Sequence, residues 1–408
     1  MSEQQVSLDA QARLYVRLVL AVGSHDPDYV DAYYGPEELR PDSLTLPQIQ
    51  QEAAKVLSEL RQWRPSQRDD MLRLRHTYLV RQLEALIARV SILQGLTLSF
   101  DEEAKALYDA DAPSWPEEHF RVLVEQLGTV LPGDGPVPER FEQFRNGFVI
   151  PVDRLDAVFS TAINESRSRT KKHIPLPAEE SFQVEYVTGK SWSAYNWYKG
   201  GCRSLIQVNT DFPITIDRAV DLASHEGYPG HHVYNSLLET ALVRGRGWVE
   251  FSVYPLFSPQ SLVAEGTANH GIEMAFPPGE RVAFEREVLF PLAGLDASQA
   301  ERYYQAHALF LRLAYAGNEA ARLYLDGQIT REAAAQWLVD YALMSPARAM
   351  QRTRFFDQYR TYVINYNLGQ DLVRAYLEKK AGPAATEESR WAEFARLLAS
   401  PRLPSGLA

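Results

Sequence analysis

The feature that most constrains this chain is an eight-residue stretch, His225-Glu226-Gly227-Tyr228-Pro229-Gly230-His231-His232. It gathers three of the nine histidines of the chain beside a glutamate and interrupts them with Pro-Gly. Neutral imidazoles are common ligands of Zn²⁺, and a nearby glutamate is the usual base that takes a proton from a metal-activated water. The stretch therefore predicts a metal site. The alternative is a polar helix junction whose buried imidazoles are simply hydrogen-bonded.

The spacing of these histidines predicts an irregular backbone. In the common zinc motif HExxH, two histidines four residues apart share one helical face, but here the fourth position holds Pro229. Residues seven apart on a regular helix lie about 10 Å apart along its axis. Two nitrogens that each lie about 2 Å from one zinc ion cannot be so far apart. We therefore expect a kink or bulge at Tyr-Pro-Gly that folds His231 or His232 back toward His225.

A second cluster follows downstream, at Ala264-Glu265-Gly266-Thr267-Ala268-Asn269-His270. Zinc peptidases often take their third protein ligand from a glutamate that lies beyond the His-Glu segment. Glu265 is the candidate for that ligand. His270 lies nearly opposite Glu265 on a helix, so we expect it to be outside the first ligand set or unrelated to the site.

Composition limits the functional classes. The chain has 408 residues, 45% of them hydrophobic and 23% charged, with a net charge of −11, which is typical of a globular protein with a large core. We find no basic stripe for nucleic acid and no apolar run long enough to span a membrane. A single cysteine, Cys202, allows no intrachain disulfide. We expect a cytoplasmic protein that binds neither nucleic acid nor membrane; the sequence does not predict its oligomeric state.

Hydrophobic periodicity predicts a mainly α-helical fold, with a small β-sheet just before the metal-binding helix. We divide the chain into an N-terminal helical region, a zinc-binding catalytic region and a C-terminal tail helix, at residues 1–177, 178–380 and 381–408. Helices are expected at 6–23, 46–62, 67–95, 101–110, 117–127, 151–172, 213–224 and 261–274, and strands at 182–187 and 204–210.

The strand 204–210 is a candidate edge strand beside the metal. Such an edge offers free backbone amides and carbonyls, with which an extended peptide can pair. The alternative is that both predicted strands only cover the core.

Several motifs carry a resemblance to a known family. The stretch from His225 to His232 resembles the signature of the bacterial "domain of unknown function 885" family, whose members are expected to be zinc metallopeptidases, distantly similar to helical gluzincins. Three further blocks match in order: Asn209-Thr210, Glu265-Gly266-Thr267-Ala268, and Tyr366-Asn367-Leu368-Gly369-Gln370. Thr267 replaces the tryptophan usual in the second block. The resemblance covers roughly residues 180–380.

The resemblance implies roles for these residues. Glu226 would be the general base, and His225, Glu265 and one histidine of the 231/232 pair would bind Zn²⁺. The histidine directly after Pro-Gly is the second ligand in the family's motif, which favours His231 over His232. Tyr366 would donate to the oxyanion, and Asn209 would contact the substrate. The implied fold is a large gluzincin-like helical domain.

Two other features have competing interpretations. Arg348 and Arg352 share a helical face and are candidates for binding a substrate carboxylate, although a solvated or salt-bridged face is the commoner explanation. Cys202 follows Gly200-Gly201, but a single buried thiol is more often structural than nucleophilic.

Together these features predict a zinc-dependent hydrolase, specifically a metallopeptidase that cleaves short peptides with metal-activated water. The alternatives are a non-catalytic helical protein that binds peptides or serves as a scaffold, and a zinc amidohydrolase that acts on a small non-peptide amide. A structural zinc site has no need of a base such as Glu226, which argues against the first alternative.

Overall fold

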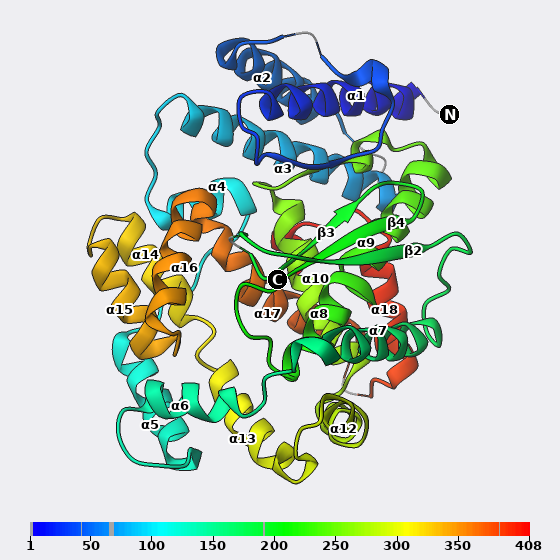
Figure 1. The fold of residues 1–408 in the computed structure, drawn as a ribbon. Helices are drawn as coiled ribbons and strands as arrows, with labels where there is room; N and C mark the ends of the chain where they lie inside the picture. Colours follow the sequence, from blue (N-terminus) through cyan, green and yellow to red (C-terminus); the bar gives the residue numbers. More distant parts are fainter. Residues whose placement is uncertain (1–2, 42, 65–68, 191, 383) are drawn as a thin grey trace.

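Helices make up most of this protein, as expected (Figure 1). The computed structural model describes residues 3–41, 43–64, 69–190, 192–382 and 384–408. No helix in those ranges has both the length and the apolar character needed to cross a bilayer.

The first three helices of the chain lie together at one end of the molecule, and the fourth lies below them, toward the middle (Figure 1). Local capping explains where two of them begin: Thr45 and Gln48 cap α2, and Ser99 and Glu102 cap α4, each in a reciprocal capping box. The predicted helix 67–95 is observed as α3, and residues 67 and 68 lie outside the described ranges. The four helices are α1 (Glu3–Gly23), α2 (Leu46–Gln62), α3 (Asp70–Leu93) and α4 (Phe100–Tyr108).

The remaining peripheral helices surround the centre of the fold (Figure 1). Their bounds are α5 (Glu117–Val130), α6 (Val137–Asn146), α7 (Leu155–Lys171), α11 (Pro278–Phe284), α12 (Phe290–Ala293), α13 (Ala300–Leu311), α14 (Ala316–Leu325), α15 (Arg331–Tyr341), α16 (Pro346–Tyr359) and α18 (Glu387–Leu398).

A small sheet precedes the motif, and its order corrects one prediction. The sheet has the order β2 (Ser181–Val187), β4 (Arg203–Asn209) and β3 (Ala194–Tyr198), with β4 parallel to β2 and antiparallel to β3. The predicted edge strand 204–210 is therefore the central strand. The aromatic segment that follows Ser193 forms β3, which pairs with one side of this central strand, so β3 and β2 are the two edge strands.

A second, two-stranded sheet joins distant parts of the chain. Strand β1 (Val30–Tyr33) pairs antiparallel with β5 (Val253–Pro255). This pairing carries residue 31 to the neighbourhood of the motif, although more than 190 positions separate them in sequence.

The centre of the fold is built from α8 (Asp217–Leu222), α9 (His231–Leu238), α10 (Pro259–Ala275) and α17 (Ile364–Ala381). Helices α10 and α17 cross with their backbones almost touching, at Gly266 and Gly369. A methyl group on Gly369 would lie 2.7 Å from the carbonyl oxygen of Leu262 and 2.9 Å from the Cα of Gly266. The two glycines thus fix how the face of α10 that carries Glu265 meets α17.

One hydrophobic core runs through much of the chain. It includes Leu8 from α1, Leu262 from α10 and Leu398 from α18. Buried residues from all three predicted regions thus contact one another, and the proposed boundaries near 177 and 380 stay a prediction from sequence.

Candidate metal and catalytic site

The backbone of the motif is irregular in the way that the spacing predicts. Helix α8 continues into a π-helical turn, Ala223–Gly227, and Tyr228 then turns to an extended conformation before α9 begins at His231. The amide of Gly230 donates to the carbonyl of Ser224 at 2.9 Å, which folds the chain back on itself. A side chain on Gly230 would overlap the carbonyl oxygen of His225, so only glycine allows this close approach.

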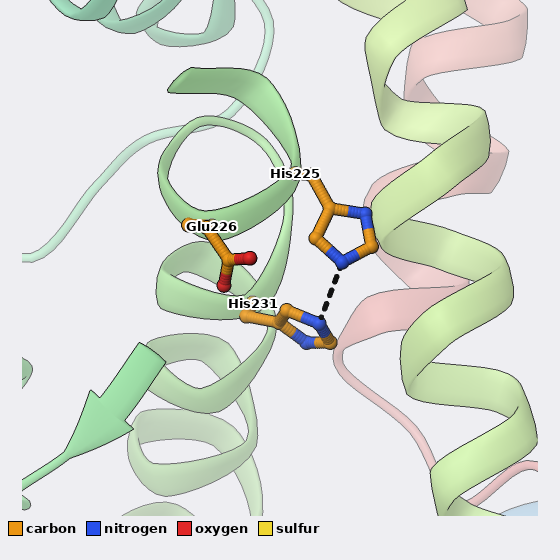
Figure 2. Close-up of side chains that lie close together, drawn as sticks. All are labelled: His225, Glu226 and His231. Carbon is orange, nitrogen blue, oxygen red and sulfur yellow. Dashed lines mark hydrogen bonds between the residues drawn. The ribbon is translucent and has the colours of Figure 1, made fainter. Parts of the chain in front are cut away.

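This fold-back brings His225 and His231 together (Figure 2). Their Nε2 atoms lie 3.2 Å apart, with the rings edge to face. Glu265 reaches the same point from α10, with Oε2 3.3 Å from Nε2 of His225 and Oε1 3.6 Å from Nε2 of His231. Two imidazole nitrogens and a carboxylate therefore form a small triangle.

The triangle has the dimensions of one face of a tetrahedral zinc site. Ligand atoms bound about 2.0–2.1 Å from a tetrahedral Zn²⁺ lie roughly 3.3–3.4 Å from one another. Oε2 of Glu265 is buried and accepts no hydrogen bond from any described residue, as expected of an atom reserved for a cation. The donor set and the spacing both fit Zn²⁺, with a fourth position left for water or substrate.

Glu226 lies beside this triangle (Figure 2). One of its carboxylate oxygens lies within 4.8 Å of the nearest nitrogens of His225 and His231. The side chain is buried, and burial raises its pKa. A carboxylate with a raised pKa, next to the ligands, suits a base that takes a proton from water.

The opposite charges of the ligand residues shift one another's pKa values and so stabilise the charged forms. Burial lowers the pKa of His231, but Glu265, Glu226 and Asp31 together raise it to about 9. Burial raises the pKa of Glu265, but the adjacent His231 and His225 hold it well below its usual value. Without a metal, the cluster therefore holds a proton at neutral pH, and a divalent cation would compete for the same place.

His225 is oriented by Asn269, a residue for which the sequence predicted no role. The Nδ2 of Asn269 donates to the backbone carbonyl of Tyr366 at 2.8 Å, so its Oδ1 faces Nδ1 of His225 at 2.9 Å. An amide oxygen can only accept, so Nδ1 of His225 carries the hydrogen and Nε2 keeps its lone pair for a metal. Asn269 lies one helical turn after Glu265, so periodicity alone could have placed it on the same face.

Glu265 is held by Tyr362, also unnoticed in the sequence. The Tyr362 hydroxyl donates to Oε1 of Glu265 at 2.8 Å. Tyr366, one turn later on the same face, lines the cavity, and no described residue hydrogen-bonds to its hydroxyl. Burial raises the pKa of Tyr366 well above its usual value, so it stays a donor. The oxyanion role of Tyr366 stays a prediction.

His232 does not join the cluster, which corrects its inclusion among the ligands. Its ring is buried, with Nδ1 2.9 Å from Oγ of Ser204 and Nε2 3.0 Å from Oε2 of Glu180. Successive residues of a helix point about 100° apart, so only one of the two adjacent histidines can face His225. His270 also lies apart, beside Glu273.

Asn209 lines the cavity, but its amide is already committed. Its Nδ2 donates to the carbonyls of Lys190 and Trp192, and its Oδ1 accepts from the amide of Asp211. Both hydrogens of this amide thus hold the adjoining loop, and the role of Asn209 in substrate binding stays a prediction. Cys202 is buried beside Glu239, away from the cavity lining.

The site opens into a cavity of about 580 Å³, a volume typical of small-molecule sites. Asp31 lines it and accepts a hydrogen bond from Tyr195 of β3; burial raises the pKa of Asp31 to about 6. Nothing in the sequence around Asp31 indicated this position. The side chains of Arg348 and Arg352, from α16, line the same cavity.

Comparisons with known proteins define the fold and leave the activity open. No protein-family model and no curated protein sequence matches the chain. Among solved structures it is similar to a "putative lipoprotein" from Colwellia psychrerythraea, with a TM-score of 0.53 and 15% identity over 90% of this chain and 63% of that one. The chain thus spans less than two thirds of that protein's length.

Two further structures resemble the chain. A protein designated BsuCP has a TM-score of 0.50 and 11% identity over 98% of this chain and 89% of that one. A "putative lipoprotein of unknown function" from Shewanella oneidensis has a TM-score of 0.47 and 14% identity over 89% of this chain and 72% of that one. At such identities the likeness concerns the fold alone, and the cytoplasmic location stays a prediction.

Proposed function

We propose that the protein is a zinc-dependent hydrolase, specifically a metallopeptidase that cleaves short peptides, and that it belongs to the bacterial "domain of unknown function 885" family. The observation that carries the proposal is the triangle of His225, His231 and Glu265, with Glu226 beside it at the end of a cavity. Zn²⁺ bound there would supply a Lewis acid that polarises a carbonyl and lowers the pKa of a bound water to about 7.

The residues of the chain have separate tasks in this reaction. Glu226 takes a proton from the attacking water and can return it to the departing amine. Asn269 and Tyr362 keep His225 and Glu265 oriented. Tyr366 donates a hydrogen bond from the cavity wall to the oxygen that gains charge as the carbonyl becomes tetrahedral.

The edge of β3 favours a peptide over other amides. The amide of Asn209 donates to the carbonyl of Ser193, and that of Lys199 donates to the carbonyl of Arg203, so these residues face β4. Pairing alternates along an antiparallel strand, so the backbone groups of Ala194 and Asn196 face the open edge. Both residues line the cavity, where an extended peptide can add as a further strand. Asn196 also donates to the backbone carbonyl of Glu226 at 2.6 Å, which ties this edge to the motif.

Metal analysis and peptide digestion test the proposal together. We expect one zinc per chain in the wild type, loss of the metal in His225→Ala, and cleavage of a mixed peptide library only by the metal-loaded wild type. Glu226→Gln should keep zinc and lower kcat about 10²–10⁴-fold, because glutamine preserves the shape but not the base.

Glu287→Gln is the matched control, because Glu287 is exposed on the surface. A Glu226→Gln variant that cleaves at the wild-type rate would remove Glu226 from the reaction. Equal zinc in wild type and His225→Ala would remove the metal site.

A further inference from the structure

Two arginines of α16 form part of the cavity wall, and no carboxylate among the described residues pairs with them. Arg348 and Arg352 are one helical turn apart, half-buried, and both line the cavity. Within the described ranges, neither makes a hydrogen bond or an ion pair. Burial lowers the pKa of both, and that of Arg348 to about 10. Arginine side chains stay protonated in proteins at neutral pH.

Buried arginines elsewhere in the protein are paired. Arg75 contacts Glu250 at 2.5 Å, and Arg89 contacts Asp26 at 2.6 Å. A cation taken out of water without a counter-charge is unfavourable, and proteins normally provide the counter-charge themselves. Arg348 and Arg352 differ from these paired arginines, and both line the cavity. We therefore expect their counter-charge to come from an anionic ligand that binds in the cavity.

Aromatic rings hold the two guanidinium groups in place. The Cζ of Arg352 lies 4.1 Å from the centre of the Phe355 ring, and that of Arg348 lies 5.9 Å from the centre of the Phe212 ring. Such contacts fix the orientation of a guanidinium without neutralising its charge. Its N–H groups remain available for the two oxygens of a carboxylate, which a guanidinium binds in a bidentate manner.

The arginine pair and the metal cluster line one cavity. Arg348 and Arg352 share its wall with His225, His231 and Tyr366. Burial and Glu265 raise the pKa of Tyr366 while Arg352 lowers it, so Arg352 and the cluster act on the same side chain. A peptide whose amide carbonyl lies at the metal would therefore share this cavity with both guanidinium groups, which can bind its terminal carboxylate.

We infer that Arg352, assisted by Arg348, binds the free C-terminal carboxylate of a peptide, and that the enzyme cleaves close to the carboxyl end. This inference rests on the proposed function, because it names the substrates of the same site. In the reaction, water adds to the amide carbonyl, the C–N bond breaks, and a new C–O bond forms. The new carboxyl group loses a proton, and the released amine gains one.

Paired substrates test the inference. We would synthesise a set of N-acetylated tripeptides, each with a free C-terminal carboxylate and with a C-terminal amide, and measure kcat/KM for both forms. The wild type should prefer the acids by about 10–100-fold, as expected for a hydrogen-bonded charge pair. Arg352→Gln should abolish most of this preference by slowing only the acids, and Arg348→Gln should reduce it less.

Arg354→Gln is the matched control, since Arg354 lies on the same helix but is exposed. It should keep the wild-type preference. A thermal midpoint for each variant shows whether the fold is retained. An equal rate on acids and amides in the wild type overturns the inference and leaves the peptidase proposal standing.

Binding to an inactive protein separates the two proposals. Calorimetry with zinc-loaded Glu226→Gln should show the acids binding at least about tenfold more tightly than the amides, and adding Arg352→Gln should remove the difference. If the acids bind more tightly but the wild type cleaves none of the peptides, the peptidase proposal is refuted and carboxylate recognition stands. Equal or absent binding of the two forms would refute carboxylate recognition, whatever the wild type cleaves.

Discussion

His231 and His232 are adjacent in sequence but lie in opposite surroundings. The His232 ring contacts Ser204 through one nitrogen and Glu180 through the other. Glu180 in turn accepts from the Tyr228 hydroxyl at 2.6 Å and from Arg167, so the whole network is satisfied within the protein. His231 faces a second imidazole nitrogen at 3.2 Å and a carboxylate oxygen at 3.6 Å.

The difference shows what distinguishes a ligand histidine from a structural one. Two facing Nε2 atoms can share at most one hydrogen, and Oε2 of Glu265 accepts no hydrogen bond from any residue that the structure describes. The His231 cluster thus has more acceptors than donors, whereas the His232 network balances them. A cation would therefore satisfy the acceptors of the His231 cluster, whereas the His232 network has no acceptor left to bind one.

The largest expected effect comes from replacing each histidine in turn. His231→Ala should lose zinc, from one ion per chain to less than about a tenth, because two protein ligands hold the ion poorly. His232→Ala should keep zinc but lose about 1–3 kcal/mol of stability, because a buried carboxylate loses a partner. Plasma mass spectrometry and thermal unfolding on both variants measure this. Loss of zinc in His232→Ala but not in His231→Ala would show that His232 is the ligand instead.

Tyr362, in the turn before α17, and Tyr366, within α17, extend the comparison to two tyrosine hydroxyls. The Tyr362 hydroxyl donates to Glu265, whereas no described residue hydrogen-bonds to that of Tyr366. Tyr366→Phe should lower kcat by about 10²–10³-fold with little change in zinc content, as loss of an oxyanion donor does. Tyr362→Phe should weaken zinc binding instead, because its hydroxyl holds Glu265. Steady-state kinetics and zinc titration on both variants test the distinction. If Tyr366→Phe is active but less stable, that tyrosine serves packing.

A smaller effect is expected from the residues that orient each histidine. Asn269→Ala should weaken zinc binding about 10–100-fold, because Nδ1 of His225 loses its acceptor. Ser204→Ala removes the equivalent partner of His232 and should leave zinc affinity unchanged. Competition with a coloured chelator measures both affinities. A similar loss in the two variants would show that the His232 network also supports the metal.

The last effect is graded, because it depends on pH and is about tenfold for a single pH unit. Because the metal-free pKa of His231 is about 9, zinc must displace its proton, and zinc affinity should fall about tenfold for each pH unit below 9. The pKa of Glu180 is lowered to about 2, so its network stabilises the fold above about pH 4.5 and loses this contribution as pH falls through 2. Zinc titrations from pH 6 to 9 and acid unfolding of the metal-free protein check the two windows. A zinc affinity independent of pH would show that His231 is already deprotonated.

The irregular backbone of the motif was predictable from sequence because Pro229 and the histidine spacing exclude a regular helix. The spacing alone did not choose between His231 and His232, since that choice depends on where α9 begins after the break; only the family resemblance favoured His231. The strand 204–210 was wrongly predicted to be an edge strand, because the aromatic segment that forms β3 does not show a clear strand pattern. Its pairing with β4 becomes evident only in three dimensions. Asn269 could have been found from its spacing to Glu265.

Asp31 is the part of the site that no local pattern indicates, because it reaches the cavity only through the pairing of β1 with β5. This has a practical consequence for anyone cloning the protein. A gene fragment trimmed to the motif-bearing stretch from 178 to 380 would encode both histidines, both glutamates and both arginines. It would still lack Asp31 and would leave the Tyr195 hydroxyl without its acceptor. Gene fragments and mutant libraries should therefore be planned around the residues that line the cavity in three dimensions, and should retain the first strand.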